Sequence, residues 1–331
     1  MKKSLIGAGI VVSFLFTAGC NLGGEKAKEA APPPPIKVSI GSGNPGSMEY
    51  MAGAAMCQAV IRGEATAHCE NLASDGSMHN VSALHEGKVT LGLARADLAY
   101  RAWFGQPPFK ERFDNLRVLF ALHQDMITLI TTQDTGVSTF RDIPGKRIGW
   151  GDEGSDDDSV VMDILKSCTI SFDALTRVKG STSLAVSGFK DHSVDAVFAI
   201  LSHPSPSVTQ LAQEQPVLFL PLTENCIAQL IGKRSYYQKG RIPGGLYRGV
   251  DADVPTFGMQ VWVMAHTDDP EETILAIVKG VFENLEMLTK ENPAFAQLSP
   301  RSMLPEFSIP YHNGALKYFA QRGWFVLEKG K

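Results

Sequence analysis

"IGSGNPGSMEYMAG", residues 40–53, follows directly after the apolar run "IKVSI" and places Gly41, Gly43 and Gly46 in the pattern G-x-G-x-x-G. An apolar run, a glycine-rich turn and a helix-forming segment, in this order, predict a strand, a tight turn and a helix. After Ser47 the apolar residues recur every three or four positions, as in a helix that packs on a sheet. They are Met48, Met51, Ala52, Ala55 and Ala59. The stretch therefore indicates an α/β fold.

The same glycine pattern occurs in dinucleotide-binding loops, but the residues around it argue against that function. A dinucleotide loop needs an acidic residue about 20 positions on, at the end of the second strand. Here Glu70 lies near the start of the next predicted strand, and Asp75 lies beyond its end. Pro45 also removes one backbone N–H group from the loop. We therefore expect no cofactor, and expect the glycines and the following helix to hold a small solute.

The order of strands and helices predicts two lobes. From residue 36 onward strands alternate with helices, and a long β-rich run that begins at Leu116 leads to a new strand, "RIGWG", which opens a second α/β unit. After "IPGGLYRGVDADVPTFG", the strand "MQVWVMAH" and a strong helix return to the first unit. Two crossings between lobes make a hinge with a cleft beside it. We assign residues 36–131 and 258–331 to lobe I, and residues 132–257 to lobe II.

The N-terminus indicates export. Residues 1–20, "MKKSLIGAGIVVSFLFTAGC", contain two lysines, an apolar stretch and small residues before Cys20, as in a secretory signal peptide with a lipobox-like cleavage site. Thr17 stands where a lipobox usually has leucine. The alternative, a membrane-spanning anchor, needs about 20 apolar residues, which is more than this stretch offers. Residues 21–35 end in a run of prolines and predict an extended tether. We expect a periplasmic lipoprotein that is attached to the membrane through lipidated Cys20.

Composition and motifs exclude several classes of function. The net charge is −4, from 31 basic and 35 acidic residues without a long basic run, which disfavours nucleic acid as a partner. A hydrolase or transferase is not supported, because G-x-S-x-G is missing and no convincing Cys/His pair stands in a loop. Asp156, Asp157 and Asp158 suggest a metal site, but consecutive residues in a first helical turn complement the helix dipole and do not converge on one point. We expect no metal there.

Four cysteines besides Cys20 remain in a chain sent to an oxidising compartment, and they allow three pairings. We favour a disulfide between Cys57 and Cys69, which would join the end of the first helix to the following strand. Free, buried cysteines are the alternative. The state of Cys168 and Cys226 stays open.

Seven stretches in a fixed order carry a resemblance to a known family. They are "IGSGNPGSMEYMAG", "SDGSMHNVSALHEGK", "LGLARADLAYRAWFG", "IPGKRIGWGDEGS", "VDAVFAILSHPSPSVTQL", "IPGGLYRGVDADVPTFG" and "FENLEMLTKENPAFAQLSP". The chain resembles the TAXI family, the extracytoplasmic solute-binding subunits of TRAP transporters. The resemblance implies a type II periplasmic-binding fold, no catalysis, and delivery of a small organic or amino acid to a TRAP membrane permease. A binding module that presents its solute to a sensor kinase is the alternative.

The resemblance also implies which residues face the solute. In lobe I they are Ser42, Gly43, Asn44, Pro45, Gly46, Ser47, Glu49, Tyr50, Ser77, Asn80, Arg95 and Asp97. In lobe II they are Gly154, Ser155, Asp156, Ser202, His203, Pro204 and Tyr247. All lie where a strand ends or a helix begins, which is where α/β crevices bind ligands. The alternatives are that the serines only cap helices, that His203 is structural, and that Tyr50 belongs to the core.

Three positions depart from the family pattern and change the charge of the cleft. Glu49 stands where an aromatic residue is common, Asp75 replaces a glycine, and Arg95 replaces a glutamine. A guanidinium suits a carboxylate and a lone carboxylate suits an ammonium group. We therefore hypothesise that Arg95 and the helix N-termini bind the acid end of a glutamate-like solute and that Glu49 binds its positive centre. The alternative is that Glu49 and Arg95 pair with each other and fill the pocket.

Overall fold

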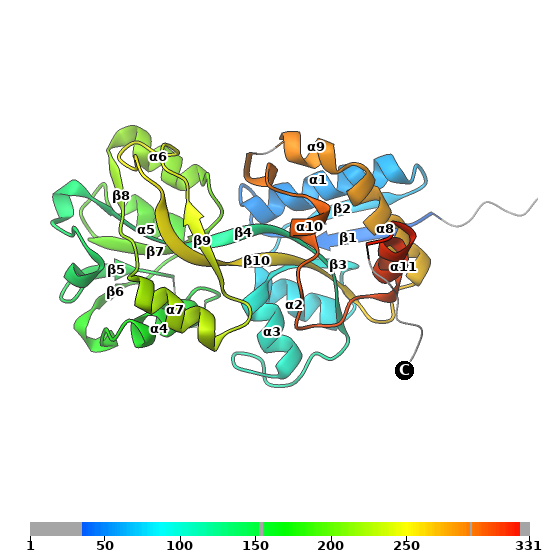
Figure 1. Cartoon of the computed structure of the whole chain (residues 1–331), viewed down its shortest axis with the longest axis horizontal. Helices are drawn as coiled ribbons and strands as arrows, with labels where there is room; N and C mark the ends of the chain where they lie inside the picture. Colours follow the sequence, from blue (N-terminus) through cyan, green and yellow to red (C-terminus); the bar gives the residue numbers. More distant parts are fainter. Residues whose placement is uncertain (1–34, 152–154, 292, 325–331) are drawn as a thin grey trace, which may run out of the picture. The chain divides into compact units, whose positions relative to one another are not determined.

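A computed structural model describes residues 35–151, 155–291 and 293–324 (Figure 1). The described residues belong to one compact unit. The signal peptide expected at residues 1–20, Cys20, the tether up to residue 34 and Gly154 lie outside the described residues. The described chain is a mixed α/β protein, which confirms the predicted fold class. Its ten-stranded sheet has the order β2-β1-β3-β10-β4-β7-β5-β6, with β8 paired to β4 and β9 paired to β10.

The first half of this unit forms around the opening stretch of sequence. Strands β1, β2 and β3 are parallel, and helices α1, α2 and α3 alternate with them. Their bounds are β1 Lys37–Gly41, α1 Met48–Gly63, β2 His68–Leu72, α2 Ser77–His85, β3 Leu91–Arg95 and α3 Ala96–Phe104. Ser47 is the N-cap of α1, and Gly87, at φ 68°, follows α2 in the left-handed conformation that glycine adopts at low cost.

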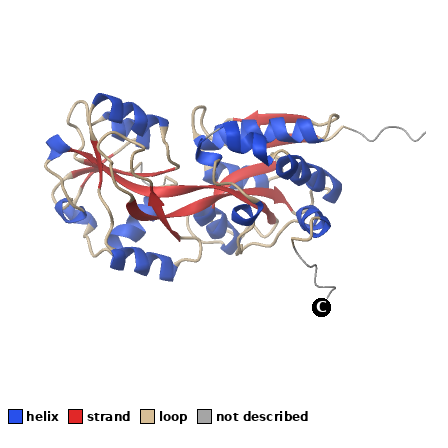
Figure 2. Ribbon diagram, turned by 45° about the horizontal axis from the view of Figure 1, so that its top comes forward, coloured by secondary structure: helices blue, strands red, loops and turns tan. Residues whose placement is uncertain are grey.

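Two long antiparallel strands, β4 (Leu116–Thr132) and β10 (Val254–His266), connect the first half to the second (Figures 1 and 2). Both strands change partners along their length. β10 pairs with β3 through residues 261–265 and with β9 through residues 254–258. β4 pairs with β7 and β8 only through its last residues, 126–132. The predicted lobe boundaries fall at the end of β4 and within β10.

The second half repeats the strand-and-helix pattern. Strands β5, β6 and β7 are parallel, and two further strands complete the sheet. The bounds are β5 Arg147–Gly149, α4 Asp158–Ser167, β6 Thr176–Val178, α5 Thr182–Ser187, β7 Ala196–Leu201, α6 Pro206–Glu214, β8 Val217–Phe219, α7 Glu224–Lys233 and β9 Gln238–Ile242. α5 ends at Ser187, and Gly188 is its C-cap.

The C-terminal segment returns to the first half through α8 (Glu271–Glu283), α9 (Leu285–Glu291), α10 (Pro300–Met303) and α11 (Asn313–Gln321). α8 packs on α1, and a Cβ atom on Gly63 would lie 2.7 Å from Cα of Gly280. Both glycines are needed for this close approach. Pro270 occupies the N-cap position of α8, and Asp269 Oδ2 accepts from the N–H of His266. No helix in the described residues has the length and apolar composition to span a membrane.

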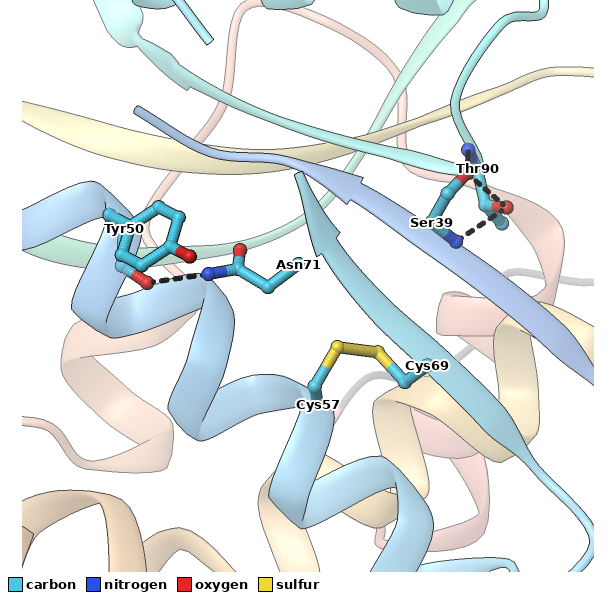
Figure 3. The surroundings of a disulfide bond; sticks show 6 residues. All are labelled: Ser39, Tyr50, Cys57, Cys69, Asn71 and Thr90. Carbon is cyan, nitrogen blue, oxygen red and sulfur yellow. Dashed lines mark hydrogen bonds between the residues drawn. A yellow bond between two sulfur atoms is a disulfide. The ribbon is translucent and has the colours of Figure 1, made fainter. Parts of the chain in front are cut away.

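Two disulfides tie helices to their neighbours. The predicted pair Cys57–Cys69 is confirmed and joins α1 to β2 (Figure 3). The second, Cys168–Cys226, joins the residue after α4 to the first turn of α7. The sequence left this pair open. Each bridge lies within one half of the protein, so neither links the two halves.

Candidate functional site

The glycine-rich loop faces the second half across a cavity of about 640 Å³, which we call the central cavity. From the first half it is lined by residues 44–49. Its lining from the second half includes Lys190, Ser202 and residues 205–207, where α6 begins. A second cavity of about 1030 Å³ lies beside α2 and also contains Ser155 and Asp156 in its wall. We call it the α2-side cavity. Asn44 and Ser181 line both cavities, so the two adjoin.

Local chemistry fixes the glycine-rich loop. Gly46 has φ 90°, and a Cβ on Gly43 would lie 2.6 Å from Oγ of Ser47, so both positions favour glycine. Ser47 Oγ accepts from the N–H of Tyr50 at 3.2 Å, which is the capping role considered as its alternative. The backbone carbonyl oxygen of Tyr50 accepts from Asn71 Nδ2 at 3.0 Å (Figure 3). Ser47 therefore both caps α1 and lines the central cavity.

Ser42 and Asn80 are buried beneath this loop. Nδ2 of Asn80 donates to the backbone carbonyl oxygens of Ser42 (2.7 Å) and Leu93 (2.8 Å). Oγ of Ser42 donates to the backbone carbonyl oxygen of Leu72. Neither side chain lines either cavity. Their contacts hold the loop against β3, so the structure places them as supports of the site.

Arg95 lies in a buried ion-pair network and is 5% exposed. Nε and Nη2 donate to the two carboxylate oxygens of Asp97 at 3.1 and 3.0 Å. Nη1 donates to Asp157 Oδ1 at 2.5 Å, and Nη2 also donates to the backbone carbonyl oxygen of Asp156. Burial by itself lowers the pKa of Arg95, but Asp97 and Asp157 outweigh it and raise the pKa above its ordinary value. A solute carboxylate would have to compete with these acceptors for the guanidinium.

The alternative pairing of Glu49 with Arg95 is wrong, because Glu49 lies against His123 instead. His123 Nε2 is 3.7 Å from Glu49 Oε1 and 3.6 Å from Asp125 Oδ1. Burial favours a raised pKa for Glu49, but His123 outweighs it and lowers the pKa to about 2. Burial and the charge of Glu49 raise the pKa of Asp125 to about 7. Sequence reasoning missed His123 and Asp125; the signal was two ionisable residues at positions i and i+2 inside the apolar run of β4.

Three of the predicted solute-facing residues in the second half line a cavity. Ser202 lines the central cavity, and Ser155 and Asp156 line the α2-side cavity. Ser155 Oγ is buried and has no hydrogen-bond partner among the described residues. Asp156 Oδ2 accepts from the N–H of Ser77 at 2.9 Å, and burial raises the pKa of Asp156 to about 6. Ser77 is buried, and its Oγ accepts from the N–H of Arg95.

His203, Pro204 and Tyr247 do not line either cavity. His203 contacts Thr128 Oγ1 (2.8 Å) and Tyr247 Oη (2.7 Å) with its two ring nitrogens. Burial lowers its pKa to about 3, so it is neutral at physiological pH. Oη of Tyr247 accepts from the N–H of Ser205 at 2.6 Å. These residues hold the turn that leads into α6, which is the structural role considered for His203.

The three consecutive aspartates contact different partners. Asp156 accepts from Ser77, Asp157 from Arg95, and Asp158 from the indole N–H of Trp150 and from Arg177. Within the described residues, the group of potential metal ligands that converges is Glu49, His123 and Asp125, whose ligand atoms all lie within 4.8 Å of one another.

Comparisons with known proteins agree with this architecture. A family model described as the NMT1-like family matches residues 40–323. A chain from work on glutathione import via GshT and the cystine ABC importer TcyBC of Streptococcus mutans has a TM-score of 0.50 at 12% identity, covering 82% of this chain and 98% of that chain. At this identity the similarity concerns the fold alone.

Two further solved structures are similar over most of their length. A TctC solute-binding protein from Polaromonas has a TM-score of 0.49 at 12% identity, covering 88% of this chain and 96% of that chain. The alkanesulfonate-binding protein SsuA from Xanthomonas axonopodis pv. citri, bound to MOPS, has a TM-score of 0.46 at 15% identity, covering 87% and 85%.

Proposed function

The chain belongs to the NMT1-like family, and from that membership we propose that it is an extracytoplasmic solute-binding protein that captures a small organic or amino acid between two lobes. The lobes are residues 36–131 with 258–331, and residues 132–257. The hinge is formed by β4 and β10, because these strands alone carry the sheet from one half to the other among the described residues. The protein binds and releases its solute without chemical change.

The observation that carries this proposal is the pair of helix N-termini at the central cavity. The start of α1, with Ser47 as its cap, approaches from the first half, and the start of α6, with residues 205–207, approaches from the second half. Helix N-termini carry partial positive charge and favour anions. A carboxylate that touches both helices gains contacts only when the lobes are closed, so the solute stabilises the closed form.

We further propose that the partner is a TRAP membrane permease, as the resemblance to the TAXI family implies, and that lipidated Cys20 keeps the protein at the membrane. The acid end of the solute binds at the two helix N-termini. Arg95 does not bind the acid end directly, because its guanidinium already pairs with Asp97 and Asp157. Glu49 supplies the negative side of the cavity, towards which an amino group of the solute would point.

Isothermal titration calorimetry with glutamate, glutamine, succinate and 2-oxoglutarate tests this function. Ser207→Asp places a negative charge in the first turn of α6, where it suits the helix but repels an anion in the cavity. We expect it to lower the affinity for a bound carboxylate at least 10-fold, or about 1.4 kcal/mol. Asn225→Asp makes the same change in the first turn of α7, outside both cavities, and should leave binding unchanged.

Unchanged carboxylate affinity in Ser207→Asp would show that the central cavity is not the solute site. If no amino acid or organic acid binds at all, the proposed solute class is wrong. The neighbouring genes separate the two partners: permease genes support transport, and an adjacent sensor-kinase gene supports signalling.

A further inference from the structure

Glu49, His123 and Asp125 form a compact ionisable group where the first turn of α1 meets the middle of β4. Glu49 lines the central cavity, and 24% of its side chain is exposed. His123 and Asp125 lie deeper, with 2% and 4% of their side chains exposed. The group therefore has one side open to the cavity and one side closed by protein.

The buried members of this group lack the partners that such groups normally have. Nε2 and Nδ1 of His123 and Oδ1 of Asp125 have no hydrogen-bond partner among the described residues. A buried polar atom without a partner costs about 1–3 kcal/mol, so native proteins rarely retain several together. Two carboxylates at one buried position also repel each other. The two carboxylates need a positive charge between them, which is supplied either by a protonated His123 or by a bound cation that His123 ligates.

The spacing suits a metal ion. His123 Nε2 lies 3.7 Å from Glu49 Oε1 and 3.6 Å from Asp125 Oδ1. Both distances are too long for hydrogen bonds. They are close to the separation of about 3.3 Å between two ligands of a tetrahedral Zn²⁺ ion with bonds of about 2.0–2.1 Å. A divalent charge would balance the two carboxylates while the imidazole binds as a neutral ligand.

We propose that Glu49, His123 and Asp125 bind one first-row divalent cation such as Zn²⁺, with its remaining coordination position open to the central cavity through Glu49. The proposal does not depend on the identity of the solute. It differs from the sequence-based expectation of no metal, because these ligands come from two distant segments and form no recognisable spacing. With the cation bound, Glu49 cannot also pair with an amino group of the solute, so this inference replaces that one contact of the proposed function and leaves the binding of the acid end at the helix N-termini unchanged.

Calorimetry on the full chain, stripped with a chelator and free of solute, tests the site directly. We expect ZnCl₂ to bind with one equivalent per chain at pH 7 and Co²⁺ to give the visible absorption of a coordinated ion. Asp125→Asn and His123→Gln each remove one ligand with little change of volume. Each should weaken binding by at least about 100-fold, because even indirect partners of metal ligands contribute 10–100-fold.

His68→Gln is the matched control, because His68 is exposed on β2 and distant surface histidines account for adventitious zinc. It should leave the affinity unchanged. Stoichiometric binding that survives in both ligand variants would place the ion elsewhere and overturn the proposal. If no cation binds to the parent, the proposal is overturned. Amino-acid binding that Glu49→Gln abolishes would then identify the group as an ammonium pocket. Circular dichroism of each variant confirms that it is folded.

Discussion

The buried Arg95 and the half-buried Asp157 form an ion pair between the two halves of the protein. Nη1 of Arg95, at the end of β3, lies 2.5 Å from Oδ1 of Asp157, at the start of α4. Asp156 adds two further links between the halves. Its backbone carbonyl oxygen accepts from Arg95, and its Oδ2 accepts from the N–H of Ser77. These contacts hold the halves together without any solute. If the lobes open as we propose, opening has to break these contacts, and the protein itself then sets part of the equilibrium between open and closed forms.

Replacing Arg95 should mainly affect stability. Arg95→Ala leaves Asp97 buried without its bidentate partner, and breaking a buried pair in this way costs about 3–5 kcal/mol. Urea unfolding at pH 7 measures the loss. Arg117→Ala is the control, because the described hydrogen bonds of Arg117 are to backbone oxygens near the surface. A free energy of unfolding that is the same in Arg95→Ala as in the parent would contradict the network.

Replacing Asp157 should mainly affect closure. Asp157→Asn keeps the size of the side chain but removes the charge that pairs with Arg95 across the cleft. If the closed form is less populated, the apparent affinity for solute falls in proportion. We expect a several-fold weaker affinity by calorimetry and a larger radius of gyration by solution scattering without solute. The same radius of gyration and affinity as the parent would show that this pair does not control closure.

The sequence predicts local features of this site well and long-range contacts poorly. The strand before the glycine-rich loop, the cap Ser47 and the apolar stripe of α1 depend on neighbours within a few positions, and the structure reproduces them. The Cys57–Cys69 pair is also close in sequence. Arg95 and Asp157 are 62 residues apart in the sequence and meet only after β4 has carried the chain from the first half to the second. No spacing rule predicts that Arg95 would be engaged by Asp157, or that Glu49 would meet His123.

His203 should make the protein less stable in mild acid. Burial lowers the pKa of His203 from its ordinary 6.5 to about 3 in the folded state. Between these values the unfolded chain binds the additional proton, so the free energy of unfolding falls as the pH decreases below about 6.5. From pH 7 to pH 5 this amounts to about 2 kcal/mol, at 1.36 kcal/mol per unit.

His203→Gln removes this titration and keeps a side chain that can both donate and accept. Denaturant unfolding at pH 7 and pH 5 should therefore show a loss about 2 kcal/mol smaller in His203→Gln than in the parent. His192→Gln, at an exposed position, is the control and should follow the parent. Parallel losses in all three proteins would mean that His203 is protonated in the folded state.

The two disulfides should differ in their contribution to stability. Cys57–Cys69 closes a loop with a sequence separation of 12, and Cys168–Cys226 one of 58. The chain-entropy relation gives about 3 kcal/mol for the first and about 4 kcal/mol for the second. Guanidinium unfolding of the Cys57→Ala/Cys69→Ala and Cys168→Ala/Cys226→Ala proteins measures both. Solute affinity should change little, since each bridge lies within one half. A smaller loss for the longer loop would contradict the entropic account.

Asn80 should couple the stability of the first half to the position of the glycine-rich loop. Its Nδ2 donates to the backbone carbonyl oxygens of Ser42 and Leu93, and Asn80→Ala leaves both of these buried oxygens without this donor. We expect a loss of about 2–4 kcal/mol, because each unsatisfied buried group costs about 1–3 kcal/mol. Asn80→Asp should be less stable still at pH 7, since its carboxylate faces two carbonyl oxygens.

Asn71→Ala is the matched control for this position. The side chain of Asn71 donates to one backbone carbonyl oxygen, that of Tyr50 in the first turn of α1. Because Asn71 is half-buried, Asn71→Ala should lower the free energy of unfolding by about 1 kcal/mol. Urea unfolding gives the order of stability, and calorimetry with a bound carboxylate shows whether the loop has moved. If Asn80→Ala is as stable as Asn71→Ala and binds solute as the parent does, Asn80 does not position the loop, and the two carbonyl oxygens must find other donors in the variant.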